Sequence, residues 1–187
     1  AHAAHVIHRD LKLDNVFLIA GATATTPNVK VLDWGIAKIM TSDPTNTFAE
    51  RLVGTPRYVS PEQARGATVA AASDVYSLGV MAYELFLDGP PFVAESAAEL
   101  LVMHLRDLPP APSARWPRIP HELESLLLAM LAKDADARPT IVEVAARLGA
   151  VRARLAPGML EATVTAPVAA PAFGRRRARR AVALARA

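Results

Sequence analysis

The hydrophobic pattern changes near residue 60, and this change constrains the fold more than any other feature of the chain. Before it, residues 6–7, 16–19 and 29–32 are short apolar runs rich in branched side chains. The last two runs flank a Gly-, Thr- and Pro-containing stretch, which predicts a β-hairpin with a long tip. After residue 60, apolar residues recur at helical spacing. We therefore expect a mainly helical fold with short β-hairpin segments near its start.

Four helices are expected in the second part of the chain. The first runs from about residue 73 to Leu87 and stops before Asp-Gly-Pro-Pro. It is apolar nearly all round, so we expect it to be buried. The others cover about 96–106, 121–132 and 140–155. Residues 36–60 show little periodicity and are expected to form a long loop, which is uncommon unless it is functional.

The charge is distributed unevenly along the 187 residues. Residues 1–150 carry 13 Lys and Arg against 17 Asp and Glu, whereas residues 151–187 carry eight arginines against one glutamate. We expect a folded region over residues 1–155 and a Pro- and Ala-rich linker with an Arg-rich tail, disordered, over residues 156–187. The basic excess belongs to the tail, so no nucleic-acid partner is expected. Contact of the tail with an anionic membrane stays open.

Residues 8–15, His-Arg-Asp-Leu-Lys-Leu-Asp-Asn, carry the strongest chemical signal. Asp10 is followed by a cation, Lys12, and then by an amide, Asn15. A carboxylate can accept the proton of an attacking hydroxyl, a cation can stabilise a transferring phosphoryl group, and an amide oxygen can hold Mg²⁺. Asp33 follows the next apolar run and suits a second Mg²⁺ ligand. The chain contains no Cys, which excludes thiol chemistry.

These residues, with later motifs, resemble the serine/threonine branch of the eukaryotic-type protein kinase family. The later motifs are G-T-P-R-Y-V-S-P-E at 54–62, D-V-Y-S-L-G at 74–79 and A-R-P-T at 137–140. The motifs occur in the family's order over residues 1 to about 150. Trp34 and Ser60 replace the usual Phe and Ala. The resemblance implies a kinase C-terminal lobe, ATP and Mg²⁺ as cofactors, and a protein substrate with a Ser or Thr acceptor.

The resemblance also implies roles for individual residues. Asp10 would be the catalytic base and Lys12 the contact to the γ-phosphate, while Asn15 and Asp33 would be Mg²⁺ ligands. The other implied roles are a substrate-loop hydroxyl for Thr55, a phosphate partner for Arg9, a buried ion pair for Glu62 and Arg138, and an anchor of the catalytic-loop backbone for Asp74.

A regulatory interpretation follows for Arg9, because a guanidinium beside a catalytic carboxylate needs an anion. A phosphate on Thr45 or Thr47 would supply it and could order the loop. Pairing of Arg9 with Asp43 or Glu50, and no switch, is the alternative.

The family's N-terminal lobe has no counterpart in the sequence, in which no G-x-G occurs. That lobe supplies a Gly-rich loop, a lysine and a glutamate that hold ATP. We therefore expect a C-terminal lobe that is inactive alone, either as a truncated gene or as an incomplete sequence. The excess of Arg over Lys and the S-P-E-Q-A run at 60–64 resemble bacterial members of the family. The expected location is the cytoplasm, either as a free protein or as the cytoplasmic part of a membrane-anchored kinase.

Two other functions stay open at this point. A kinase lobe can serve as a non-catalytic interaction module, although such a module needs none of Asp10, Lys12, Asn15 and Asp33. A small-molecule phosphotransferase of the antibiotic-kinase type shares the H-x-D-x-x-x-x-N loop. The segment 54–62 and Lys12 argue against this second alternative.

Overall fold

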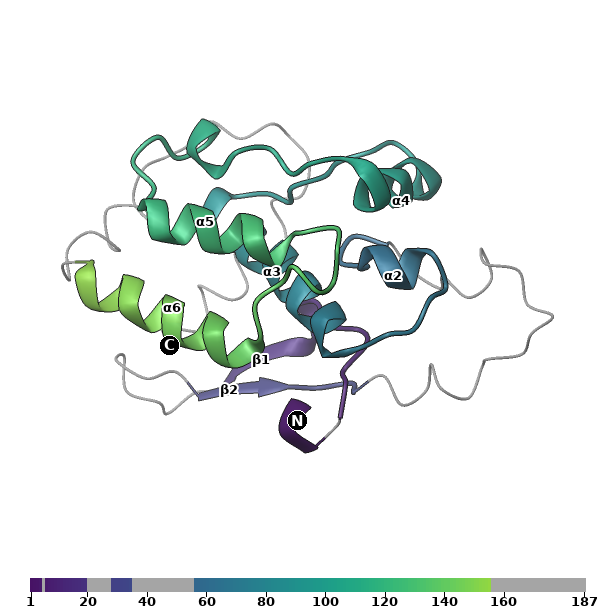
Figure 1. The fold of residues 1–187 in the computed structure, drawn as a ribbon, viewed down its shortest axis with the longest axis horizontal. Coiled ribbons are helices and arrows are strands. Elements are labelled where there is room, and N and C mark those ends of the chain that lie inside the picture. Colours follow the sequence, from purple (N-terminus) through teal and green to yellow (C-terminus); the bar gives the residue numbers. More distant parts are fainter. Residues whose placement is uncertain (5, 20–27, 35–55, 156–187) are drawn as a thin grey trace.

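A computed structural model describes residues 1–4, 6–19, 28–34 and 56–155 of the chain. The described part contains a two-stranded sheet followed by helices (Figure 1). Strands β1 (Val16–Ile19) and β2 (Asn28–Val31) are antiparallel, with Val16 opposite Val31. The predicted hairpin is therefore confirmed. Residues 6–7 form neither strand nor helix.

All four predicted helices are present, with limits that shift by one or two residues. They are α3 (Ala71–Leu87), α4 (Ala97–Arg106), α5 (His121–Met130) and α6 (Ile141–Arg154). A short helix, α2 (Pro61–Ala64), precedes them. Single 3₁₀ turns occur at η1 (His2–Ala4), η2 (Leu13–Asn15) and η4 (Pro112–Ala114).

Local chemistry explains where several helices begin and end. The hydroxyl of Ser96 accepts the N–H of Glu99 at the start of α4, and Thr140 does the same for Glu143 at the start of α6. Such caps satisfy amides that have no partner within the helix. Helix α3 ends at Asp88, which adopts a left-handed conformation (φ 54°). Asp tolerates this region better than most residues do.

Helix α3 forms the centre of the molecule and packs against α5, which in turn packs against α6 (Figure 1). Gly79 brings α3 and α5 together, because a Cβ built on it would lie 2.8 Å from the Cβ of Met130. The buried apolar residues of this core are Tyr76, Val80, Tyr83, Leu87, Ile119, Leu123, Leu127, Leu131 and Val151, with Val75, Leu126, Met130 and Val144 in a second cluster. The prediction that α3 is buried is confirmed for most of its length, whereas Leu85 is exposed.

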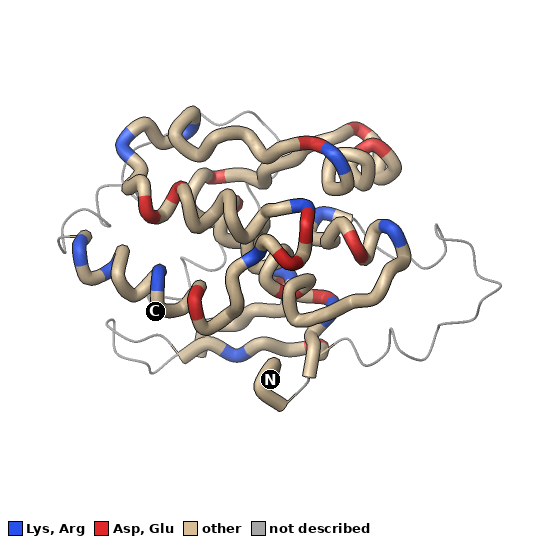
Figure 2. The backbone as a smooth tube through the Cα atoms, in the orientation of Figure 1, with Lys and Arg blue, Asp and Glu red and all other residues tan. Residues whose placement is uncertain are grey.

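The hairpin and α4 lie on opposite sides of α3 in Figure 1. Charged side chains connect the two C-terminal helices: Figure 2 shows basic residues along α6 and acidic residues at the start of α5. Arg154 pairs with Glu122, and Arg147 donates to Ser125. Within the described ranges, no helix is long and apolar enough to cross a membrane.

Candidate active site

Residues 8–15, called the Asp10 loop below, are held to the first turn of α3 by one buried carboxylate. Asp74 is 6% exposed, and its Oδ2 accepts the backbone N–H of His8 at 2.8 Å. Its Oδ1 accepts the N–H of Arg9 at 2.9 Å. The Nε2 atom of His2 lies 2.8 Å from Oδ2 as well. Arg9 has a left-handed backbone (φ 67°), which costs a non-glycine residue free energy and persists only where neighbours hold it.

Two of the three polar residues that follow Asp10 in the loop, Lys12 and Asn15, contact Asp10. Lys12 Nζ donates to Asp10 Oδ2 at 2.7 Å, and the two side chains are 35% and 31% exposed. Asn15 is buried, and its Nδ2 donates to the backbone carbonyl of Asp10 at 2.9 Å. The loop therefore brings a carboxylate, an ammonium group and an amide together at Asp10, whose side chain is partly exposed.

Asp33 is brought to this loop by its neighbour Leu32. The N–H of Leu32 donates to the carbonyl of Asn15 at 2.8 Å, and the Nε2 of buried His8 lies 3.0 Å from the carbonyl of Leu32. The N–H of Asp10 donates to the other His8 ring nitrogen at 3.3 Å. Asp33 itself is exposed and has a left-handed backbone (φ 56°).

Trp34 packs on the Asp10 loop without being buried. Its ring centroid lies 5.0 Å from that of His8, and the side chain is 38% exposed. The Trp34 ring therefore contacts His8 while part of its surface stays exposed to solvent.

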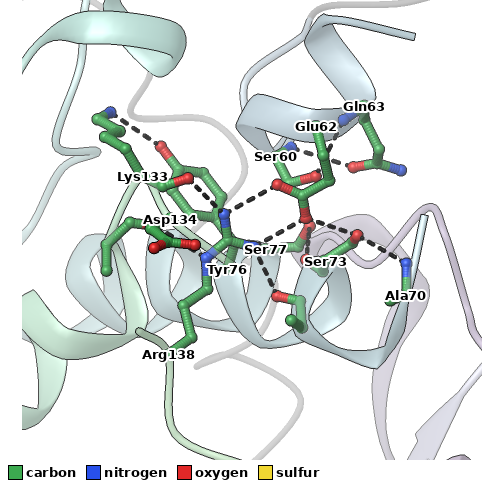
Figure 3. A network of polar contacts seen from close by, with 12 residues as sticks. Ser60, Glu62, Gln63, Ala70, Ser73, Tyr76, Ser77, Lys133, Asp134 and Arg138 are labelled. Carbon is green, nitrogen blue, oxygen red and sulfur yellow. Dashed lines mark hydrogen bonds and ion pairs between the residues drawn. The ribbon is translucent and has the colours of Figure 1, made fainter. Parts of the chain in front are cut away.

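Glu62 and Arg138 form a buried, bidentate ion pair between α2 and the segment before α6 (Figure 3). Arg138 donates to both Glu62 oxygens, at 2.8 and 2.9 Å. Its remaining N–H groups donate to the carbonyls of Ala72, Ala132 and Lys133, so all five donors are used. Ser73 donates to Glu62 at 2.6 Å.

The ion pair controls the protonation of Glu62. Burial alone would raise the pKa of its carboxyl group, but the hydrogen bonds from Arg138 and Ser73 outweigh burial and lower the pKa to about 2. The pair therefore stays ionised at neutral pH and ties α2 to the helical core.

A second polar cluster in the core was not predicted. Tyr76 O–H lies 3.0 Å from Nδ1 of His104, and Lys133 donates to the carbonyls of Met103 and His104. Burial lowers the pKa of His104 to about 4 and that of Lys133 to about 8. The Lys133 ammonium lies 4.5 Å from the Phe92 ring centroid. Because these residues are dispersed in the sequence, no motif signals the cluster.

Gln63 is a residue of the site that sequence motifs did not single out. Its side chain reaches from α2 to the Asp10 loop, where Nε2 donates to the carbonyl of Arg9 at 2.7 Å. The available signal was the Ser-x-x-Gln pattern at 60–63, which is typical of a capping box.

Several predicted site residues lie outside the described ranges, namely Thr45, Thr47 and Thr55. The alternative partners of Arg9, Asp43 and Glu50, lie outside them as well. A hollow of about 410 Å³ is lined by residues 137–139, 143, 146 and 147. Of the predicted site residues the hollow includes only Arg138, whose donors are all used.

The oxygen atoms of Asn15 and Asp33 are the candidate metal ligands. The nitrogen of the Asn15 amide is bound to the Asp10 carbonyl, so its oxygen is the atom left to face a cation. No cluster of three or more His, Cys, Asp and Glu that could hold a metal occurs among the residues the structure describes. Two oxygen ligands fit Mg²⁺, which proteins usually bind through one or two side chains together with substrate phosphates.

Comparison with known proteins identifies the family to which the chain is similar. Residues 1–147 match the family described as the protein kinase domain. The serine/threonine-protein kinase Pkn1 of Myxococcus xanthus is 41% identical over 180 residues, which cover 90% of this chain and 26% of Pkn1. A probable serine/threonine-protein kinase of Streptomyces coelicolor is 42% identical over 139 residues, 74% of this chain and 20% of that protein.

PknB of Mycolicibacterium smegmatis, also a serine/threonine-protein kinase, is 38% identical over 178 residues, 91% of this chain and 28% of PknB. The chain thus spans about a quarter of the length of these curated relatives.

Proposed function

Since the chain belongs to the protein kinase family, with bacterial serine/threonine kinases among its relatives, we propose that its Asp10 loop serves phosphoryl transfer. The donor is the γ-phosphate of ATP, and the acceptor is a serine or threonine hydroxyl of a protein. The observation that carries the proposal is the arrangement at Asp10. Its carboxylate accepts a hydrogen bond from the Lys12 ammonium at 2.7 Å, and its backbone carbonyl accepts one from the Asn15 amide at 2.9 Å.

Asp10 acts as the base in this proposal. Its carboxylate accepts the proton of the substrate hydroxyl while the hydroxyl oxygen forms a bond to the γ-phosphorus. The bond from that phosphorus to the bridging oxygen breaks, and ADP leaves with the electron pair. Lys12 lies beside Asp10 and places its positive charge where the transferring phosphoryl oxygens carry negative charge.

Asn15 and Asp33 are proposed to hold Mg²⁺. The donor set fits, because both offer hard oxygen ligands at the edge of the Asp10 loop. Magnesium, when bound, neutralises charge on the nucleotide phosphates. The protein's own contribution is to hold both ligands in place: Asn15 through Asp10, and Asp33 through the backbone contacts of Leu32.

Two further roles belong to the proposal and rest on the family resemblance. Thr55 ties the substrate loop to Asp10 and Lys12, and Arg9 binds a phosphate on Thr45 or Thr47. Within the described ranges, Arg9 bonds to Asp74 through its backbone N–H and to Gln63 through its backbone carbonyl, and neither contact uses the guanidinium. We place the protein in the cytoplasm with a protein substrate as its partner.

The test requires a Pkn1 fusion, in which the N-terminal lobe of Pkn1 is joined before residue 1 of this chain. Transfer of phosphate from ATP to casein is measured at increasing Mg²⁺ concentration, with Pkn1 as the positive control. Asp33→Asn should lower the rate at least 100-fold or raise the Mg²⁺ requirement at least tenfold. Glu143→Ala, which changes an exposed side chain of α6, should match the parent. A parent-like Asp33→Asn fusion would show that Asp33 is not a ligand.

A further inference from the structure

Gln63 connects α2 to the residue that precedes Asp10. Its Nε2 donates to the carbonyl of Arg9 at 2.7 Å, while its Oε1 accepts the N–H of Ser60 at 3.0 Å. One partner is an acceptor and the other a donor, so the amide has a single orientation that satisfies both. Figure 3 shows the Gln63 side chain beside Ser60.

The backbone of Arg9 is held on both sides. Its N–H donates to Asp74 on α3, and its carbonyl accepts from Gln63 on α2. The carbonyl is part of the planar peptide unit that leads into Asp10, so fixing it fixes the direction in which the chain enters Asp10. Arg9 has a left-handed backbone, which needs such support.

Helix α2, which carries Gln63, is tied to the core. Glu62 precedes Gln63 in α2 and is buried in its ion pair with Arg138. Ser60 caps the same helix through its hydroxyl, which accepts the N–H of Gln63 at 3.4 Å. The Gln63 amide therefore extends toward the Asp10 loop from a helix that the core holds in place.

We propose that Gln63 is a positioning residue for phosphoryl transfer, because its amide orients the Arg9–Asp10 peptide and thereby the Asp10 carboxylate. This inference rests on the proposed function, in which Asp10 accepts the substrate proton. A displacement of about 1 Å in a reacting group can lower a rate about 100-fold. Loss of one hydrogen bond at this peptide is therefore expected to lower the rate of phosphoryl transfer.

The competing explanation is that Gln63 only caps α2, and two substitutions separate the possibilities. Gln63→Glu keeps an oxygen acceptor for Ser60 but replaces the donor to Arg9 with a carboxylate oxygen that repels the carbonyl. Gln63→Ala removes both contacts. Glu143→Ala is the matched control, since Glu143 occupies the same capping-box position in α6 and does not contact the Asp10 loop.

The first measurement is steady-state kinetics of the Pkn1 fusion. Gln63→Glu should lower kcat at least tenfold, leave KM for ATP within twofold, and leave the thermal midpoint close to that of the parent. Glu143→Ala should leave kcat unchanged. A parent-like kcat for Gln63→Glu would overturn the proposal, since the cap alone would then explain the residue.

The second measurement is hydrogen exchange in the 187-residue chain itself, which does not depend on activity. Gln63→Glu should accelerate exchange at the Arg9 and Asp10 amides at least fivefold, with no change in α5. Unchanged exchange would show that the contact does not hold the peptide and would overturn the proposal. A fusion that transfers no phosphate, with exchange still accelerated, would contradict the proposed function while confirming that Gln63 orients this peptide.

Discussion

The carboxylate of Asp74 accepts the backbone N–H of Arg9 at 2.9 Å, across 65 residues of sequence. The same carboxylate accepts the N–H of His8, so the first turn of the central helix directly holds the chain that leads into Asp10. The position of the Asp10 loop is thus coupled to α3, most of which is buried.

Asp74→Asn should destabilise the chain by about 1–3 kcal/mol, because an amide cannot accept both backbone N–H groups and leaves one buried donor unsatisfied. Urea denaturation of the 187-residue chain measures this change. Asp88→Asn makes the same substitution at the exposed end of α3 and should stay within about 0.5 kcal/mol of the parent. Equal stability of the two variants would contradict the anchoring role of Asp74.

Glu62→Gln should destabilise the chain by about 3–5 kcal/mol at neutral pH, because it leaves the buried Arg138 charge without its counterion. It should also change the pH dependence of stability. The pKa of Glu62 is about 2 in the folded chain and near 4.5 when the group is unperturbed. The unfolded state therefore takes up the proton first, and the contribution of the pair is lost as the pH falls from about 5 toward 2.

The measurement for this pair is the free energy of unfolding between pH 7 and pH 2. The parent should lose more stability over this range than Glu62→Gln. Glu95→Gln, which removes an exposed carboxylate, controls for the loss of one charge. Parallel curves for the parent and Glu62→Gln would show that the pair does not titrate as described.

The sequence predicted the hairpin and the four long helices because the residues within and beside each element indicate it. Ser96 and Thr140 mark helix starts, and the Asp-Gly-Pro-Pro stretch marks the end of α3. The polar contacts between distant residues were harder to predict. Neither the Gln63–Arg9 contact nor the cluster around His104 follows from periodicity, because both depend on how separate helices pack.

Gly79→Ala should destabilise the chain by about 1–3 kcal/mol, because the added methyl group would lie 2.8 Å from Met130 Cβ and force α3 and α5 apart. Gly149 provides the matched control within α6, since nothing lies within 4 Å of a Cβ there. Gly149→Ala should stabilise the chain by about 0.5–1 kcal/mol through helix propensity. Thermal unfolding of both variants tests the pair, and a shift of the same sign in both would contradict the packing argument.

The 187-residue chain alone should bind ATP weakly, with a dissociation constant above 1 mM, because its sequence contains no G-x-G loop to enclose the phosphates. Calorimetric titration with Mg²⁺ and ATP checks this expectation, and the Pkn1 fusion serves as the comparison. Submillimolar binding by the chain alone would mean that the chain binds the nucleotide without such a loop.

The central claim is that the Asp10 loop transfers phosphate to protein hydroxyl groups, and phosphoamino-acid analysis of the Pkn1 fusion tests it most directly. Casein is incubated with ATP labelled at the γ-phosphate and with the parent fusion, Asp10→Asn or Asp88→Asn. The parent and Asp88→Asn should produce labelled phosphoserine and phosphothreonine at equal rates, and Asp10→Asn should lower the rate at least 1,000-fold while remaining folded. Labelling by Asp10→Asn at the parent's rate would contradict the account.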